Sequence, residues 1–168
     1  MQRRLILMRH AKAAAHSPNG RDHGRPLAER GLRDAGFMAE VLEKLGWSPA
    51  KVVSSDAART RQTWASMNHT SALSIPVDLH PELYLAGLPA IRSVARGWTS
   101  EHSGPVLLLG HNPGWEMAAS TLSGRILGMT TANAVLLEGD GETWSAALNQ
   151  PWRLVRHLVP KQIRRNGL

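Results

Sequence analysis

The run Pro105-Val106-Leu107-Leu108-Leu109-Gly110 places four consecutive apolar residues between a proline and a glycine. Because no polar residue alternates with the apolar ones, the run predicts a strand that is buried on both faces. Such strands are typical of parallel sheets that helices cover on both sides. The run therefore predicts an α/β domain.

Candidate strands and helices alternate along the rest of the chain. Short apolar runs predict strands at 3–8, 51–54, 75–79 and 106–109, and sequence patterns predict helices at 27–45, 57–68, 88–98 and 115–122. Gly46 is expected to end the first helix and Asp56 to cap the second. Two more strands, at 130–138 and 143–148, are expected to form a hairpin around Gly139-Asp140-Gly141. We therefore expect a mostly parallel sheet with an antiparallel edge.

Length and composition exclude several classes of protein. The 168 residues fit one domain, and 42% hydrophobic with 20% charged residues exclude a largely disordered chain. The absence of cysteine excludes disulfide scaffolds, zinc–thiolate sites, iron–sulfur clusters and cysteine nucleophiles. No apolar run approaches the roughly 20 residues that span a bilayer, and Arg9 and His10 interrupt the N-terminal apolar run too early for a signal peptide. We expect a cytoplasmic protein with no membrane partner.

Positive charge is concentrated near the C-terminus. The net charge is +7, and residues 151–168 hold five basic and no acidic side chains, which accounts for +5 of it. A nucleic-acid-binding protein more often carries its charge on a folded face. We therefore expect one domain over residues 1–150, no nucleic-acid partner, and a solvated basic tail over 151–168 that packs on the domain or trails from it.

Chemically useful side chains follow the predicted strands. Open α/β sheets bind ligands beyond the carboxyl ends of their parallel strands. His10, preceded by Arg9, follows the first strand, and His111 follows the fourth. Arg59 lies early in the helix after the second strand, and Glu82 follows the third. Each residue alone is more often structural or solvent-exposed, and only their convergence at one rim favours a functional site.

These five residues suit phosphoryl transfer without a metal ion. Arg9 and Arg59 offer planar donors that match a phosphoryl group, and a neutral His10 is a competent nucleophile near pH 7. A protonated His111 would stabilise the charge of the transferred group. Glu82 could protonate the leaving group if its neighbours keep it protonated. Because His10 must be neutral and His111 charged, we expect a bell-shaped pH profile.

Three motifs resemble those of the histidine phosphatase (phosphoglycerate mutase-like) superfamily. They are Leu7-Met8-Arg9-His10-Ala11, the run Ser-Ser-Asp-Ala-Ala-Arg-Thr-Arg-Gln-Thr at 54–63, and Gly110-His111-Asn112-Pro113. The chain length and the run Arg-Pro-Leu-Ala-Glu-Arg-Gly at 25–31 are most similar to the small SixA-type phosphohistidine phosphatase branch. The resemblance implies a three-layer α/β/α sandwich of the phosphoglycerate mutase-like fold.

The resemblance also implies roles for individual residues. His10 would be phosphorylated transiently, and the phosphate pocket would consist of Arg9, Arg59 and His111. Apart from the resemblance, Lys12 and Arg25 are candidates to extend that pocket toward the substrate, with solvated loop charge as the alternative for both. Two positions depart from the common pattern: Ala11 stands where many members have glycine, and Asp56 where many have proline. Neither position has a charged role in the family.

The expected activity is that of a metal-independent phosphatase acting on phosphohistidine in a protein. A phosphatase for small phosphomonoesters and a non-catalytic module that binds phosphate or nucleic acid are the alternatives. Glu82 is less needed for phosphohistidine, because the imidazole leaving group is already labile. No cofactor is expected, because the chain has no GxGxxG or Walker A motif, and no metal is expected, because the five histidines His16, His23, His69, His80 and His102 lack metal-ligand spacing. The sequence does not determine the oligomeric state.

Overall fold

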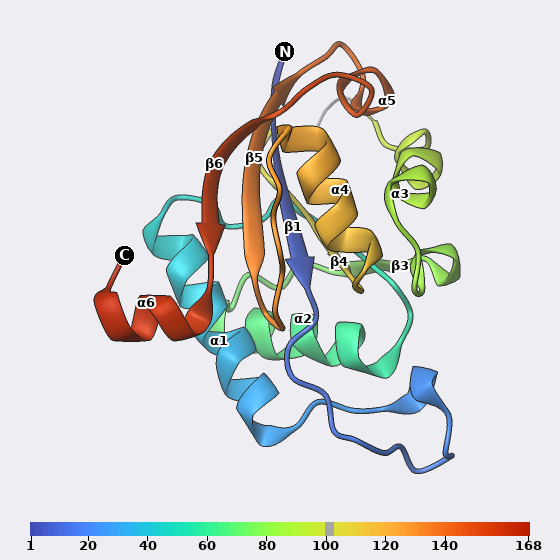
Figure 1. Cartoon of the computed structure of the whole chain (residues 1–168), viewed down its shortest axis with the longest axis vertical. Coiled ribbons are helices and arrows are strands. Elements are labelled where there is room, and N and C mark those ends of the chain that lie inside the picture. Colours follow the sequence, from blue (N-terminus) through green and yellow to red (C-terminus); the bar gives the residue numbers. More distant parts are fainter. Residues whose placement is uncertain (100–102) are drawn as a thin grey trace.

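The computed structural model describes residues 1–99 and 103–168, so His102 lies outside the described residues. It shows a six-stranded sheet of order β3-β2-β4-β1-β5-β6 between two layers of helices (Figure 1). The strands are β1 (Gln2–Arg9), β2 (Lys51–Ser54), β3 (Val77–Leu79), β4 (Val106–Gly110), β5 (Ala134–Asp140) and β6 (Arg153–Leu158). Strands β3, β2, β4 and β1 are parallel, whereas β5 and β6 are antiparallel to their neighbours. The predicted α/β/α class with a mostly parallel sheet and an antiparallel edge is confirmed.

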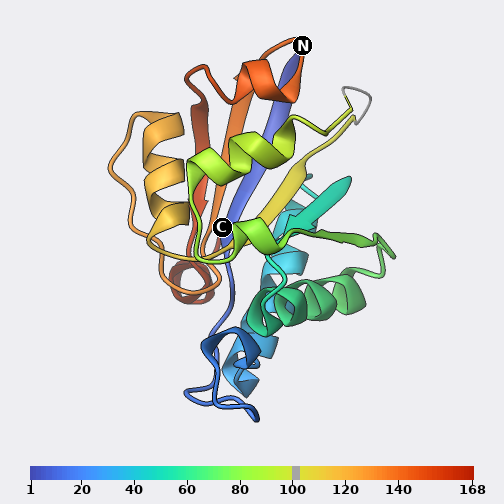
Figure 2. The same cartoon turned by 90° about the vertical axis from the view of Figure 1, so that its right-hand side faces the viewer.

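Helices cover both faces of the sheet, as Figures 1 and 2 show from two directions. One face packs against α1 (Glu29–Lys44), α2 (Ala58–Ser71) and α6 (Pro160–Asn166). The other packs against α3 (Leu88–Ala95), α4 (Gly114–Ser123) and α5 (Trp144–Ala147). Two single 3₁₀ turns, η1 (Asp22–Gly24) and η2 (Pro81–Leu83), lie in the connecting loops.

The position of β4 between two layers of helices explains why its sequence is continuously apolar. Leu107 and Leu109 belong to the core beneath α1 and α2, whereas Val106 and Leu108 belong to the core beneath α3 and α4. All four side chains are completely buried. Since successive residues of a strand point to opposite faces, a strand with helices on both sides needs an apolar residue at every position.

Several predicted boundaries are confirmed, and one cap is wrong. Gly46 follows α1 with φ +69°, the left-handed conformation that favours glycine at the end of a helix. Asp56 does not cap α2, because the N-cap residue is Ala57 and it makes no side-chain cap. The Asp56 carboxylate instead contacts His23 Nε2 at 2.8 Å. Helix α3 ends at Ala95, before the expected residue 98.

The predicted hairpin is half wrong. A strand forms in the first half, but β5 spans Ala134–Asp140 rather than 130–138, so Gly139 and Asp140 end the strand instead of forming the turn. Residues 143–148 fold as α5 and its two flanking residues. The buried side chains are Trp144, Ala147 and Leu148, whose spacing is that of a helix face rather than of a strand. Thr143 caps the helix, because its hydroxyl oxygen accepts a hydrogen bond from the Ala146 amide at 3.0 Å.

The antiparallel partner of β5 is β6, which lies in the segment expected to be a solvated tail. Leu158 at the end of β6 is buried, and Ile163 of α6 packs against the same core. Most of the basic side chains of 151–168 project from this strand and helix and remain exposed. Residues 151–168 therefore complete the sheet of the domain. The charge alone did not predict this, because an edge strand with one solvated side tolerates basic residues.

Two further observations concern partners. Trp47, Trp64 and Trp115 are buried, so they pack in the core and offer no stacking surface. No helix among the described residues is long and apolar enough to cross a membrane.

Candidate active site

The carboxyl ends of three parallel strands meet at one rim of the sheet. The His10 amide donates a hydrogen bond to the Gly110 carbonyl at 3.1 Å, which joins the ends of β1 and β4. The Ser55 amide donates to the Leu109 carbonyl at 3.1 Å, which joins the ends of β2 and β4. The loops that follow these strands therefore begin next to one another, as expected for the carboxyl ends of parallel strands.

His10 is held with one ring nitrogen ready to react. The residue is buried, and its Nδ1 lies 2.7 Å from the Ala11 carbonyl oxygen. Because a carbonyl only accepts, Nδ1 carries the hydrogen and Nε2 carries the lone pair. Arg59 Nε donates to that Nε2 at 3.3 Å. The nitrogen of His10 that carries the lone pair therefore faces a guanidinium group.

Arg59 is itself fixed by the loop that contains Asp22. Its Nη1 donates to the Asp22 carbonyl at 2.9 Å, and its Nη2 donates to the Asp22 carboxylate at 3.0 Å. The Tyr84 hydroxyl donates to the same carboxylate. Although Asp22 is half exposed, it holds a buried arginine whose side chain is 4% exposed. Asp22 therefore orients Arg59 so that its Nε points at His10.

His111 stands opposite His10, with ring centroids 5.4 Å apart. Its Nε2 lies 2.8 Å from the Ser55 hydroxyl, which fixes the ring, and its Nδ1 is buried without a hydrogen-bond partner among the described residues. The Tyr84 ring packs edge-on against the His111 ring at 5.3 Å. Among the described residues, His111 thus presents one ring nitrogen without a hydrogen-bond partner beside the His10 ring.

Arg9, which precedes His10, is anchored through its side chain. Its Nη1 donates to the Met129 carbonyl at 3.0 Å, while its Nε is buried without a partner among the described residues. Burial lowers the pKa of Arg9, and the negative charge of Glu116 raises it again. Glu116 in turn receives hydrogen bonds from Asn112 at 2.9 Å and from the Met129 amide at 3.0 Å.

The structure brings Arg25 to the site but not Lys12. Arg25 Nε lies 3.4 Å from the Asp22 carboxylate, and its positive charge contributes to lowering the pKa of His10. Lys12 is exposed, and within the described residues its backbone carbonyl alone forms a hydrogen bond, which it accepts from the Ala28 amide. The prediction that Lys12 contacts substrate stays a prediction.

Glu82 lies on η2 and makes no recorded contact with the two histidines or with Arg59. Its carboxylate contacts His80 Nδ1 at 3.3 Å. A hydrogen bond from its own backbone amide and this contact lower the pKa of Glu82. A carboxyl group with a lowered pKa is ionised near neutral pH, so this environment does not favour a proton donor.

Both site histidines are uncharged near neutral pH in this arrangement. Burial lowers the pKa of His10 to about 4; the bond to the Ala11 carbonyl opposes this change, and the Arg59, Arg9 and Arg25 charges add to it. Burial and the Arg59 charge lower the pKa of His111 to about 3. The expected protonated His111 therefore does not follow from the protein groups alone. A bound phosphate dianion would raise this pKa, because an opposite charge favours the protonated ring.

Three buried nitrogens near His10 lack hydrogen-bond partners among the described residues: Arg9 Nε, His111 Nδ1 and Arg25 Nε, of which the last is ion-paired with Asp22. Unpaired buried donors are costly, and such groups commonly mark a place where a ligand supplies the acceptor. The guanidinium groups of Arg9 and Arg25 are positively charged and planar, which fits a tetrahedral oxyanion with several acceptor oxygens. No group of three or more acidic or histidine side chains suited to a metal ion occurs in the described part of the chain.

Sequence reasoning missed three residues of the site. Ser55 directly follows β2, so the rule that ligands bind at strand ends could have identified it. Tyr84 comes two residues after Glu82, and no pattern marks it. Asp22 lies three residues before Arg25 in a loop without periodicity, and only the folded chain shows that it contacts Arg59.

Comparisons with known proteins agree with this geometry. The profile of the histidine phosphatase superfamily (branch 1) matches residues 5–84, a range that includes Arg9, His10 and Arg59 but ends before His111. An uncharacterized chloroplastic protein of Arabidopsis thaliana is 39% identical over 178 residues, which cover 95% of this chain and 79% of that protein.

Two solved structures are similar over nearly the whole chain. A candidate phosphohistidine phosphatase SixA from Agrobacterium tumefaciens is 30% identical, with a TM-score of 0.78 over 94% of this chain and 98% of its own. A protein histidine phosphatase SixA in complex with tungstate is 21% identical, with a TM-score of 0.81 over 97% and 99% of the two chains. The second likeness shows the shared fold.

Proposed function

Because the chain belongs to the SixA-type branch of the histidine phosphatase superfamily, we propose that it removes phosphate from phosphohistidine on a protein. The observation that carries the proposal is the group of cations Arg9, Arg25 and Arg59 and the His111 ring around His10, with Arg9 Nε and His111 Nδ1 lacking hydrogen-bond partners among the described residues. Arg9, Arg59 and His111 bind the phosphoryl group, and Arg25 extends this pocket at its open side. The reaction needs no cofactor or metal.

The first step transfers the phosphoryl group to His10. The Nε2 lone pair attacks phosphorus, a P–N bond forms, and the bond from phosphorus to the substrate imidazole breaks. The electron pair of that bond stays on the substrate nitrogen, and the imidazole leaves neutral because its other nitrogen carries a proton. The positive groups stabilise the equatorial oxygens during the transfer.

The second step regenerates the enzyme. A water molecule attacks the phosphorus of phospho-His10, the P–Nε2 bond breaks, and its electron pair returns to His10. The water loses a proton to solvent and orthophosphate leaves. Asp22 supports both steps as a positioning residue, because it holds Arg59 with Nε directed at the reacting nitrogen.

Trapping the intermediate tests the proposal. A histidine-phosphorylated, ³²P-labelled protein is mixed with the enzyme in EDTA, and label on the enzyme is measured together with released phosphate. We expect acid-labile label on the wild type and a loss of turnover of at least about 10³-fold in His10→Ala. His69→Ala, which removes an exposed histidine of α2, is the matched control. Undiminished turnover in His10→Ala would refute the proposal.

Substrate choice separates the alternatives. Rates on the phosphorylated protein are compared with rates on a panel of small phosphomonoesters, whose alkoxide leaving groups need a proton donor. We expect the protein to be preferred and Glu82→Gln to change its rate less than about twofold, since an exposed, ionised carboxylate supplies no proton. A preference for a small ester that Glu82→Gln abolishes would favour the phosphomonoesterase. Phosphate binding without turnover on any substrate would favour the non-catalytic module.

We also propose that the protein acts in the cytoplasm, on the grounds of its sequence. The chloroplastic Arabidopsis relative shows that close similarity is compatible with another compartment. Fractionation of the native cells, followed by detection with a specific antibody, tests the location.

A further inference from the structure

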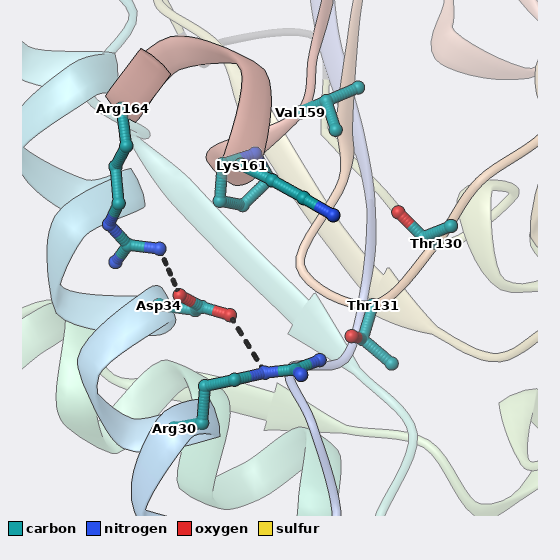
Figure 3. Close-up of a pocket in the computed structure, with 8 residues that line it drawn as sticks. Arg30, Asp34, Thr130, Thr131, Val159, Lys161 and Arg164 are labelled. Atoms are coloured by element: carbon teal, nitrogen blue, oxygen red, sulfur yellow. Dashed lines mark hydrogen bonds and ion pairs between the residues drawn. The ribbon is translucent and has the colours of Figure 1, made fainter.

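A second cavity, of about 460 Å³, lies outside the catalytic site (Figure 3). It is bordered by α1, α6 and the loop that precedes β5. This volume falls within the roughly 300–1,000 Å³ typical of small-ligand sites. The residues that give it polar character are Arg30, Asp34, Thr130, Thr131, Lys161 and Arg164. None of them belongs to the proposed phosphate pocket.

The cavity is lined mainly by positive side chains, some of which are held by an ion pair. Three cationic side chains line it, against the single carboxylate of Asp34. The Asp34 side chain is only 8% exposed and pairs with both Arg164 Nη1 and, at 3.8 Å, Arg30 Nε. The buried Asp34 carboxylate therefore holds the Arg164 guanidinium at the cavity wall, lies near that of Arg30, and neutralises only part of their charge. Groups that are held beforehand lose little freedom when a ligand binds.

Further donors face the same space. Lys161 forms no ion pair within the described part of the chain, and Figure 3 shows its amine extending toward Thr130. The Thr130 hydroxyl accepts a hydrogen bond from Asn133 at 2.7 Å, so its own hydrogen is free to be donated. The Arg30 guanidinium extends toward Thr131 from the opposite wall (Figure 3).

We propose that this cavity binds an oxyanion, namely the phosphate or carboxylate group of a small molecule. Guanidinium groups bind such anions with paired hydrogen bonds, and an ammonium with hydroxyls completes the set of donors. The site is independent of the catalytic proposal, because it shares no residue with the phosphate pocket.

The wall of the cavity is continuous with the catalytic site. Arg9 donates to the Met129 carbonyl through its side chain and to the Asn133 carbonyl through its amide, and the Ala132 amide donates to the His10 carbonyl at 3.0 Å. A ligand that contacts Thr130 therefore contacts the segment that positions Arg9. Any coupling between the two sites would be reciprocal.

NMR titration of the ¹⁵N-labelled full chain tests the site, with inorganic phosphate in one arm and succinate in the other. We expect the amides of Thr130, Thr131 and Lys161 to shift saturably with at least one probe, with a dissociation constant below about 1 mM. The arm with tighter binding identifies the recognised group. Shifts near His10 report the catalytic pocket separately, so failure of one site is distinguishable from failure of the other.

A matched pair of variants distinguishes a specific binding site from nonspecific electrostatic attraction of the anion to the basic surface. Lys161→Gln removes a lining charge, whereas Arg165→Gln removes the same charge from α6 outside the cavity. We expect binding to weaken about fivefold in Lys161→Gln and less than about twofold in Arg165→Gln. A dissociation constant above about 1 mM with both probes, or equal weakening in both variants, would overturn the proposal.

Discussion

The buried ring of His10 should stay neutral in acidic solution where most histidines are charged. Burial lowers its pKa to about 4, and the positive charges of Arg59, Arg9 and Arg25 act in the same direction. Compared with an ordinary value near 6.5, this corresponds to about 3 kcal/mol against the protonated form. At pH 5.5 the ring should therefore be about 97% neutral, whereas an ordinary histidine would be about 10% neutral.

The measurement is an NMR titration of the His10 Cε1–H signal from pH 3.5 to 8, in a buffer of weakly bound anions. The signal is assigned by its absence in His10→Gln. We expect a midpoint near 4 and an upward change in Arg59→Gln, because that variant removes a cation facing Nε2. Addition of vanadate should raise the midpoint of His111 by adding negative charge beside its ring. A His10 midpoint at or above about 6 would refute the burial argument.

Three further perturbations follow from the same contacts. In the folded protein the pKa is about 4 for His10 and about 3 for His111, below the value near 6.5 in the unfolded chain. As the pH falls, the unfolded chain therefore binds protons at these two histidines before the folded protein does. Urea titrations should therefore show the free energy of unfolding falling by about 2–3 kcal/mol per histidine between pH 7 and pH 4.5, and a flat dependence would contradict the assignment. Ser55→Ala removes the one hydrogen-bond partner that the His111 ring has among residues 1–99 and 103–168, and should cost about 1–3 kcal/mol of stability and lower turnover, whereas Ser55→Thr should retain most of both. Gly114→Ala would place a Cβ 1.8 Å from a backbone carbonyl oxygen and should lower Tm strongly, whereas Gly128→Ala meets no atom within 4 Å; equal Tm values would show that the backbone can yield.

The sequence alone determined the class of fold and the residues at the centre of the candidate site. Apolar runs such as 106–109 identified the buried parallel strands, because a strand covered on both sides has no place for polar residues. The residues that follow those strands then identified Arg9, His10, Arg59 and His111, because the carboxyl ends of parallel strands share one rim. Both inferences depend on local pattern and a general rule of topology, and neither needs knowledge of side-chain contacts.

Tertiary contacts decided the rest. Residues 143–148 form a helix rather than a strand because Trp144, Ala147 and Leu148 pack together into the core, and the second antiparallel strand comes from the basic segment instead. Asp22 and Tyr84 join the site through contacts across 37 and 62 residues of chain, which no local pattern encodes. The charge states of His10 and His111 depend on how deeply the folded chain buries each ring and where it places Arg59, so only the assembled structure fixes them.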